Sequence, residues 1–328
     1  MKTSLVTGCA GFIGSHLTDY LLNKNHKVIG VDSLITGNIK NINEAKKNKN
    51  FKYIKSDICE KKIFNKIKKL DYVFHIAGLA DIVPSIENPV NYHNSNVNGT
   101  LNIIENIKKF KIKKLVYAAS SSCYGPNPNY PTNENNKIAT AYPYALTKYI
   151  AENYIDHWSK IYNIPYISLR LFNVYGIRSR TNSNYGAVFG VFLKQILENK
   201  PLTVVGNGKQ KRDFIHVKDV VRAFYKSATS KYKNKIYNVG SNNPVTILKL
   251  TKLLNAKKIT FIPKRPGEPL VTNADINKIK RDLNWSPSIS INQGVNEILQ
   301  NINLWKNAPL WDAQNISNET KLWFKHLK

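Results

Sequence analysis

The chain has 328 residues, of which 42% are hydrophobic and 21% are charged, a length and composition that support a large core and exclude a disordered or fibrous protein. Its formal net charge of +28 would suit nucleic acid, an anionic membrane or an acidic substrate. Because 42 of the 49 basic residues are lysines spread along the whole length, we interpret the charge as a compositional bias and expect no specific nucleic-acid partner.

Short β-branched runs alternate with helical segments in the first half, which is the pattern of a parallel sheet flanked by helices. Strands are expected at Ser4–Thr7, Lys27–Val31, Phe51–Lys55, Tyr72–His75, Leu115–Ala118 and Tyr166–Leu171. Helices are expected at Phe12–Lys24, Ile86–Phe110 and Tyr144–Tyr162. We therefore predict an α/β fold with a Rossmann-type, doubly wound parallel sheet.

The chain changes character after Asn173, where glycine and proline divide it into shorter elements. We expect residues 1–172 to form the sheet domain, and residues 173–328 to form mainly a smaller C-terminal α/β domain. A helix at Val217–Ser227 and a strand at Lys235–Val239 would return to the first domain, so that this return covers about 212–240.

A glycine-rich loop joins the first strand to the first helix. Gly8 suits a tight turn, Gly11 lets the backbone approach a pyrophosphate, and Gly14 lets the helix pack closely on the strand. The N–H groups of Phe12, Ile13 and Gly14 open the helix and would face the phosphates. The strand, loop and helix occur in the order that a dinucleotide site requires.

Acidic residues follow the second and third strands. Asp32 stands about 20 residues after the loop, where a carboxylate binds the adenosine ribose. It would repel a 2′-phosphate, so NAD is the predicted cofactor, although Asp32 could instead cap a helix. Asp57 could contact the adenine edge, directly or through the neighbouring Ile58 backbone, or cap the helix that follows it.

Tyr144 and Lys148 are four residues apart on a predicted helix, so their side chains share one face. A lysine ammonium and an oxidised nicotinamide close by would lower the pKa of a tyrosine toward neutral pH and make it a usable base. The fifth strand ends in Ser120, Ser121 and Ser122, at the edge of the sheet where ligands bind in such folds. Ser120 could bind a substrate hydroxyl, whereas the other two serines could equally form a turn.

These motifs together resemble the extended short-chain dehydrogenase/reductase superfamily, over nearly the whole chain. Further matching segments begin at Arg170, Arg212, Arg265 and Asn284. Within the superfamily the chain most resembles the nucleotide-sugar 4-epimerases. It is more similar to the branch that acts on UDP-N-acetylhexosamines than to the branch restricted to UDP-glucose and UDP-galactose. The resemblance implies that the first domain binds NAD and that the second mainly binds a UDP-sugar.

The resemblance also implies roles for individual side chains. Tyr144 would be the base, Lys148 would bind the nicotinamide ribose and tune Tyr144, and Ser120 would hydrogen-bond the sugar 4-hydroxyl. Arg212 and Arg265 would neutralise the diphosphate. Further NAD contacts are expected at Ala77, Gly78 and Asn96. Further contacts to the UDP-sugar are expected at Ser121, Ser122, Asn173, Val188, Glu268 and Thr272, with Asn173 at the diphosphate and Glu268 at the uridine ribose.

Departures from the family patterns narrow the reaction. The related 4,6-dehydratases carry an Asp and a Glu directly after the position of Ser120, and the related decarboxylases usually have a Glu at the position of Ser122. This chain has serines there, which disfavours both reactions. Ala80 and Thr272 stand where enzymes restricted to UDP-glucose often have Lys and Tyr. The smaller Thr272 leaves room for an N-acetyl group beside C2 of the sugar, and would also tolerate a uronic acid or a plain hexose.

We therefore predict an NAD-dependent epimerase that inverts C4 of a UDP-sugar, with UDP-GlcNAc and UDP-GalNAc as the best substrate pair and UDP-Glc and UDP-Gal as further candidates. Tyr144 would take the proton of the 4-hydroxyl while the C4 hydride passes to NAD. The 4-keto sugar would then turn over and take the hydride back on its other face. The alternatives are a UDP-glucuronate or UDP-galacturonate 4-epimerase, a nucleotide-sugar dehydrogenase or reductase, and a catalytically silent binder.

The sequence favours a cytoplasmic protein without a membrane anchor. Cys9, Cys59 and Cys123 form no C-x-x-C motif or paired framework, and no apolar run approaches the ~20 residues that span a bilayer. The histidines show no ligand spacing, so no metal is expected. The resemblance suggests a homodimer through Ile86–Phe110 and Tyr144–Tyr162, although the apolar stripes of these helices could face only the sheet.

Overall fold

The computed structural model describes residues 1–65, 67–126, 128–179 and 187–327. Its main sheet, as far as the described residues show, has seven parallel strands in the order β11-β6-β5-β4-β1-β2-β3. These strands are β1 (Thr3–Thr7), β2 (Lys27–Asp32), β3 (Phe51–Lys55), β4 (Tyr72–His75), β5 (Lys114–Ser120), β6 (Tyr166–Leu171) and β11 (Lys235–Val239). The predicted fold class is confirmed, and the strand ends agree to within two residues.

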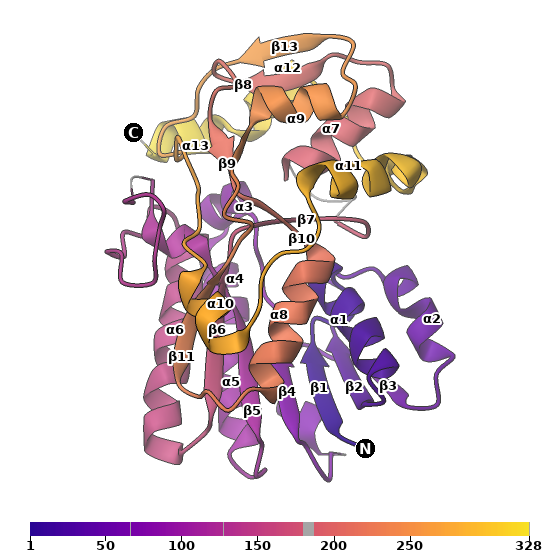
Figure 1. Cartoon of the computed structure of the whole chain (residues 1–328), viewed down its shortest axis with the longest axis vertical. Coiled ribbons are helices and arrows are strands. Elements are labelled where there is room, and N and C mark those ends of the chain that lie inside the picture. Colours follow the sequence, from indigo (N-terminus) through magenta and orange to yellow (C-terminus); the bar gives the residue numbers. More distant parts are fainter. Residues whose placement is uncertain (66, 127, 180–186, 328) are drawn as a thin grey trace.

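Thirteen α-helices surround this sheet or lie beyond its carboxyl edge within the described chain (Figure 1). They are α1 (Phe12–Asn23), α2 (Asn43–Lys46), α3 (Ile82–Glu87), α4 (Pro89–His93), α5 (Gly99–Ile107), α6 (Pro143–Tyr162), α7 (Val188–Leu197), α8 (Val217–Thr229), α9 (Ile247–Leu253), α10 (Asn277–Leu283), α11 (Ile291–Gln300), α12 (Ala313–Glu319) and α13 (Lys321–His326). Short strands complete the fold: β7 (Asn173–Tyr175), β8 (Leu202–Val205), β9 (Lys211–Arg212), β10 (Phe214–His216), β12 (Val245–Thr246) and β13 (Ile259–Ile262).

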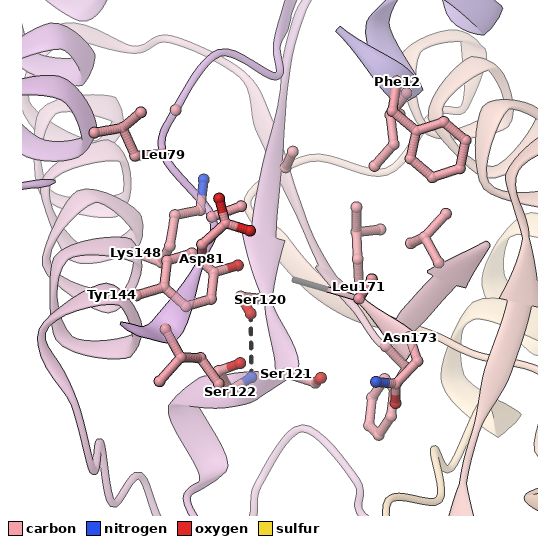
Figure 2. Close-up of a pocket in the computed structure, with 18 of the residues that line it drawn as sticks. Phe12, Leu79, Asp81, Ser120, Ser121, Ser122, Tyr144, Lys148, Leu171 and Asn173 are labelled. Atoms are coloured by element: carbon pink, nitrogen blue, oxygen red, sulfur yellow. Dashed lines mark hydrogen bonds between the residues drawn. The ribbon is translucent and has the colours of Figure 1, made fainter. Parts of the chain in front are cut away.

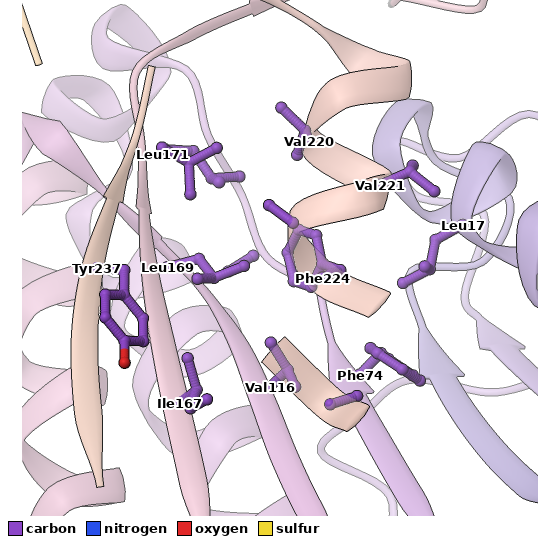
Figure 3. Close-up of a cluster of buried hydrophobic side chains, with 14 of the residues drawn as sticks. Leu17, Phe74, Val116, Ile167, Leu169, Leu171, Val220, Val221, Phe224 and Tyr237 are labelled. Carbon is purple, nitrogen blue, oxygen red and sulfur yellow. The ribbon is translucent and has the colours of Figure 1, made fainter. Parts of the chain in front are cut away.

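Both faces of the main sheet are buried under helices, which is why its strands read as nearly continuous apolar runs. On one face α1 and α8 place Leu17, Val220 and Phe224 against Phe74 and Val116 (Figure 3). On the other face α5 and α6 cover the sheet with the side chains Ile103, Ile104, Ile107, Ala151 and Ile155. The two layers together hold the strands in a doubly wound arrangement.

A third apolar cluster lies outside the main sheet and joins α7, α9 and α11 to the short strands. Phe192, Leu250 and Ile298 are fully or almost fully buried there. β8 pairs with β13 in parallel, and β9 pairs with β12 antiparallel. This C-terminal cluster stands over the carboxyl edge of the main sheet (Figure 1).

The chain returns to the main sheet twice. The expected return is seen in β11, which pairs with β6, and in α8, which packs on the sheet beside α1. A second return, which the sequence patterns do not indicate, brings α10 and Trp285 into the same apolar cluster as α8. Trp285 is fully buried there and donates its indole N–H to the Asp219 carbonyl at 3.1 Å.

The single helix predicted over Ile86–Phe110 is wrong in its first part. Helix α3 ends at Glu87, and α4 starts at Pro89 after Asn88, which has the non-helical angles φ −132° and ψ 61°. Proline excludes the residue before it from the helical region and has no N–H to donate, so the helix breaks at this place. A π-helical turn at Asn94–Asn98 then leads into α5.

The order of the strands places the candidate site. Going outward from β1, the chain continues to β2 on one side, whereas β4 lies on the other side, so the connections diverge between β1 and β4. Ligands bind at the carboxyl ends of strands at such a switch point. The glycine loop after β1 and the Ala77–Gly78 turn after β4 meet there. In the described chain, no helix is both long and apolar enough to cross a membrane.

Candidate active site

The loop between β1 and α1 brings backbone atoms into close contact. Gly8 has a positive φ of 71°, and a Cβ on Gly14 would lie 1.9 Å from the Gly8 carbonyl oxygen. A Cβ on Gly11 would lie 3.1 Å from the same oxygen, which is tight but less severe. Gly11 is the N-cap of α1, so no side chain caps the N–H groups of the first turn. This helix terminus therefore suits an anion that accepts from those groups.

The Asp32 carboxylate supports the same loop. It is buried, and its two oxygens accept from the N–H of Ala10 at 2.9 Å and of Leu34 at 2.8 Å. Burial raises the pKa of Asp32, and the backbone hydrogen bonds oppose that rise. After β3, Asp57 accepts from the Cys59 N–H at 2.8 Å, as a local turn-forming aspartate does.

One cavity of about 650 Å³ connects these groups to the second half of the chain. Every predicted site residue except Asn96 lines it. The lining includes Gly8, Gly11, Phe12, Ile13, Gly14, Asp32, Asp57, Ile58, Ala77, Gly78, Ser120, Ser121, Ser122, Tyr144, Lys148, Asn173, Val188, Arg212, Arg265, Glu268 and Thr272. Figure 2 shows Tyr144 and Lys148 projecting into this cavity beside Ser120, with Asn173 on the other side.

Tyr144 belongs to the first turn of α6, which starts at Pro143. Burial raises the pKa of Tyr144 above its ordinary value of 10, and a hydrogen bond with Ser120 opposes that rise. Ser120 ends β5 and also accepts from the Ser122 N–H at 3.2 Å. The predicted lowering of the Tyr144 pKa depends on Lys148 together with an oxidised nicotinamide, and it stays a prediction. Within the chain alone, the loss of water around the phenol outweighs its polar contacts and the pKa is raised.

Lys148 is buried one turn further along α6. Burial lowers the pKa of Lys148 to about 7, and the Glu152 carboxylate opposes this shift. Its Nζ lies 4.3 Å from the centroid of the Tyr117 ring, so the aromatic face is a close partner of the ammonium. Glu152 itself forms a buried ion pair with Arg170, 2.5 Å between Oε1 and Nη2, which already compensates much of its charge.

Asn96 is the predicted contact that does not reach the cavity. It is buried, and its amide donates to the Leu79 carbonyl and to the Thr147 hydroxyl, each at 3.0 Å. Its Oδ1 accepts from the Leu79 N–H at 2.8 Å. Its predicted place near the cofactor stays a prediction. Within the described chain, this side chain holds the turn after β4 to helix α6.

His75, the last residue of β4, is fully buried beneath that turn. Its Nδ1 lies 2.8 Å from the Thr7 hydroxyl and its Nε2 lies 2.9 Å from the Thr100 hydroxyl. Burial lowers the pKa of His75 to about 3, so the ring is neutral at physiological pH. Its two hydrogen bonds join β1, β4 and α5 under the site.

Asp213 organises the far end of the cavity. Its buried carboxylate accepts from the Ser241 N–H at 2.6 Å, the Ala274 N–H at 2.8 Å and the Asn242 N–H at 3.1 Å. Next to it, Arg212 donates to Glu268 at 2.7 Å and to the Pro269 carbonyl at 2.8 Å. Arg212, expected at the diphosphate, and Glu268, expected at the uridine ribose, are therefore held next to each other in the cavity wall.

Thr272 links this end to the segment after β6. Its hydroxyl donates to Asn173 Oδ1 at 3.0 Å and accepts from the Asp213 N–H at 2.9 Å. The side chain that was expected to leave room for the sugar thus also fixes Asn173. Both residues line the cavity.

Several aromatic residues that line the cavity were not predicted, among them Tyr142 and Trp323. The Tyr142 ring stacks beside Tyr144, with centroids 6.4 Å apart and planes 7° apart. Its position two residues before Tyr144 was the only feature of the sequence that could have indicated a place in the site. Trp323 in α13 also lines the cavity. No sequence motif marks Trp323, because it is far along the chain from the other lining residues and only the fold brings it to them.

The comparison with known families agrees with this geometry. The model of the NAD dependent epimerase/dehydratase family matches residues 4–240, which include the glycine loop, Ser120, Tyr144 and Lys148. The chain belongs to this family. The predicted family is therefore confirmed, and the predicted cofactor, NAD, is the cofactor of this epimerase/dehydratase family. The glycine cradle, which a Cβ at position 14 would fill, and the uncapped first turn of α1 fit its pyrophosphate.

Relatives within this epimerase/dehydratase family match almost the whole chain. A UDP-glucuronate 4-epimerase of Thermodesulfobacterium geofontis is 37% identical, over 95% of this chain and 96% of that protein. The structure of a UDP-N-acetylglucosamine 4-epimerase from Methanobrevibacter ruminantium, in complex with UDP-N-acetylmuramic acid, superposes with a TM-score of 0.85 at 32% identity, over 92% of this chain and 99% of that one. A UDP-glucuronic acid 4-epimerase from Bacillus cereus, holding UDP-glucuronic acid and NAD, gives 0.84 at 31%, with the same coverage.

Proposed function

We propose that this family member is an NAD-dependent epimerase that inverts C4 of a UDP-sugar, with UDP-GlcNAc and UDP-GalNAc as its substrate pair. One observation carries the proposal: a single cavity is lined by the glycine loop, by Ser120, Tyr144 and Lys148, and by the paired Arg212 and Glu268. The names of the relatives, which are UDP-sugar 4-epimerases, support the reaction type.

The side chains divide the work as follows. Ser120 would hold the sugar 4-hydroxyl beside Tyr144, which would take its proton. Tyr144 would later return that proton to the C4 oxygen, once the 4-keto sugar has turned over and received the hydride on its other face. When bound, oxidised NAD supplies the acceptor for the C4 hydride and a positive charge close to Tyr144. That charge matters here, because burial raises the pKa of Tyr144 and the pKa of Lys148 is only about 7. Lys148 would bind the nicotinamide ribose.

The sugar is chosen at the far end of the cavity. Arg212 and Arg265 would bind the diphosphate, since a guanidinium group forms bidentate hydrogen bonds with phosphate oxygens. Thr272 and Ala80 are small and line the cavity, which supports room for an N-acetyl group when the sugar turns over. UDP-glucuronate is the second candidate, because the relative from Thermodesulfobacterium geofontis carries that name and serine hydroxyls at positions 121 and 122 line the cavity.

The test is an incubation of the purified protein, without added cofactor, with UDP-GlcNAc, UDP-Glc and UDP-GlcA in separate reactions. Proton NMR of each mixture reports the C4 epimer. We expect UDP-GalNAc from UDP-GlcNAc. Conversion of UDP-GlcA alone would replace the proposed substrate by the second candidate. A reaction that needs added NAD and accumulates its reduced form would contradict the epimerase and support a dehydrogenase.

The assignment of the base has its own test. Tyr144→Phe removes the hydroxyl that exchanges the proton, and loss of such a group lowers the rate about 10²- to 10⁴-fold. Tyr149→Phe is the matched control, because Tyr149 lies on the same helix and does not line the cavity. The control is expected to keep its rate. A Tyr144→Phe protein that epimerises at the rate of the control would remove Tyr144 from the mechanism.

The homodimer remains part of the proposal. The helices expected to form its interface, α4 with α5 and α6, expose Val90 (68%), Leu146 (46%) and Tyr162 (46%). Because these apolar side chains are exposed, they are available to a partner helix pair, and the apolar residues of these helices do not all face the sheet.

A further inference from the structure

The C-terminal segment, residues 301–327, has no role in the chemistry described above, yet it is tightly attached to the molecule. Trp305 and Ile316 are buried in the third apolar cluster. The Gln195 amide donates to the Trp311 carbonyl at 2.5 Å, and Lys194 Nζ donates to the Lys306 carbonyl at 2.7 Å. These contacts fix the segment to α7 before it continues into α12 and α13.

Helix α13 then reaches the end of the cavity that Arg265 and Glu268 line. It contacts α3, the helix that follows β4 and whose residues Ile82 and Val83 line the cavity (Figure 1). On its other side, Leu327 lies near Gly267, where a glycine Cβ would be 3.9 Å from the Leu327 Cβ. The segment therefore bridges α3 and the loop that carries Arg265 and Glu268.

Trp323 is the side chain by which α13 reaches the cavity. It is only 4% exposed, yet it belongs to none of the three apolar clusters of the described chain. Its indole N–H donates to the Pro266 carbonyl at 2.7 Å, and the Arg265 guanidinium carbon lies 5.6 Å from the centre of its ring. Trp323 thus presents its ring to the cavity while its N–H is hydrogen-bonded and its face lies against a guanidinium. Tryptophans in binding sites have this arrangement.

We propose that Trp323 is a substrate-binding residue, brought by α13 to the end of the cavity formed by Arg265 and Glu268. Its indole braces the Arg265 guanidinium and forms part of the wall against which the uridine diphosphate binds. The inference rests on the proposed function, since it takes the nucleotide of the UDP-sugar as the ligand. It predicts that the C-terminal segment contributes to substrate affinity and leaves the chemical step and NAD retention unchanged.

The experiment compares Trp323→Ala and Trp323→Phe with the wild type in the full-length protein. Calorimetry measures the Kd of UDP alone, steady-state kinetics measures KM and kcat with the UDP-sugar, and the absorbance of denatured protein measures bound NAD. For Trp323→Ala we expect Kd and KM to rise about 10-fold, within the range of about 2- to 30-fold that a cation–π contact covers. Trp323→Phe keeps a ring and should lie between the alanine variant and the wild type.

The matched control is Phe324→Ala, which removes an aromatic ring from the same helix. Phe324 is 40% exposed and does not line the cavity, so the control should bind UDP as the wild type does. If Trp323→Ala shows no thermal unfolding transition and is therefore not folded, the test uses Trp323→Phe and tryptophan fluorescence instead. UDP should change the emission of the wild type and of Trp158→Phe, and should change that of Trp323→Phe much less.

The outcomes separate this inference from the proposed function. Wild-type affinity for UDP in Trp323→Ala, or a fall in kcat with KM unchanged, would overturn the inference. If the wild type binds UDP but epimerises none of the sugars, and the Trp323 variants still bind UDP more weakly, the proposed reaction fails while the role of Trp323 stands. A wild type that does not bind UDP would reject both.

Discussion

The two ends of the cavity are built by different means. At the cofactor end, backbone packs on backbone: a Cβ at Gly14 would lie 1.9 Å from a carbonyl oxygen, and Asp32 accepts from main-chain N–H groups of the same loop. At the substrate end, side chains hold each other: Arg212 pairs with Glu268 and Thr272 bonds to Asn173. Where backbone packs on backbone there is no room for an added side-chain atom, whereas a network of side chains can be altered by substituting one residue at a time. The first end thus fits one cofactor, and the second can be adjusted to different sugars.

The largest effect is expected at the cofactor end. Gly14→Ala forces two backbone segments apart, because no flexible side chain can move out of the way of the new Cβ. Overpacking typically costs about 1–3 kcal/mol, and a clash of this size with backbone should lie at the upper end of that range. We expect a lower Tm and loss of bound NAD from the purified protein. Gly11→Ala places its Cβ 3.1 Å from the same oxygen and should show a smaller loss of both. Equal stability and equal NAD content in the two variants would break the comparison.

An intermediate effect is expected at the substrate end. Asp213→Asn keeps the shape of the side chain but turns an NH₂ group toward buried N–H donors, among them those of Ser241 and Ala274. A buried donor that loses its acceptor costs roughly 1–3 kcal/mol. The free energy of unfolding should fall by about that amount, and KM for the UDP-sugar should rise while NAD stays bound.

The control for this variant is Asp275→Asn, since Asp275 accepts an exposed N–H, that of Asn277 at 2.8 Å. It should change stability by less than Asp213→Asn. If Asp213→Asn lost bound NAD as well as affinity for the UDP-sugar, the two ends of the cavity would not be independent of each other.

The effect that is smallest at neutral pH concerns Lys148, which lies where the two ends meet. Burial lowers the pKa of Lys148 from 10.5 to about 7. Between these values the unfolded chain holds a proton that the folded chain has released, so the free energy of unfolding of NAD-free protein rises with pH. Relative to Lys148→Met, wild-type stability should increase by about 1 kcal/mol per pH unit from neutral pH toward pH 10. A difference that is constant with pH would show that Lys148 stays protonated when it is folded.

The cofactor end rests on shorter sequence patterns than the substrate end. The glycine loop, Asp32 and the pair Tyr144–Lys148 are short patterns whose structure depends on neighbouring residues, and all of them line one cavity. The error at Asn88 was also local, since the proline that breaks the helix was visible. Asn96 does not line the cavity, and its hydrogen bonds go to Leu79 and Thr147. The sequence does not show whether a buried amide binds a ligand or another group of the protein.

By itself, then, the amino-acid sequence determined the parallel sheet and the dinucleotide loop, because hydrophobic periodicity and glycine spacing act over a few residues. The family followed from the resemblance of motifs along nearly the whole chain. Only the tertiary structure decided the pKa directions of Tyr144 and Lys148, since burial is set by all the segments that close over α6. It also decided that Trp323 lies beside Arg265, a contact between residues 58 positions apart in the chain. Contacts of that kind follow from how the helices pack, and no local pattern specifies them.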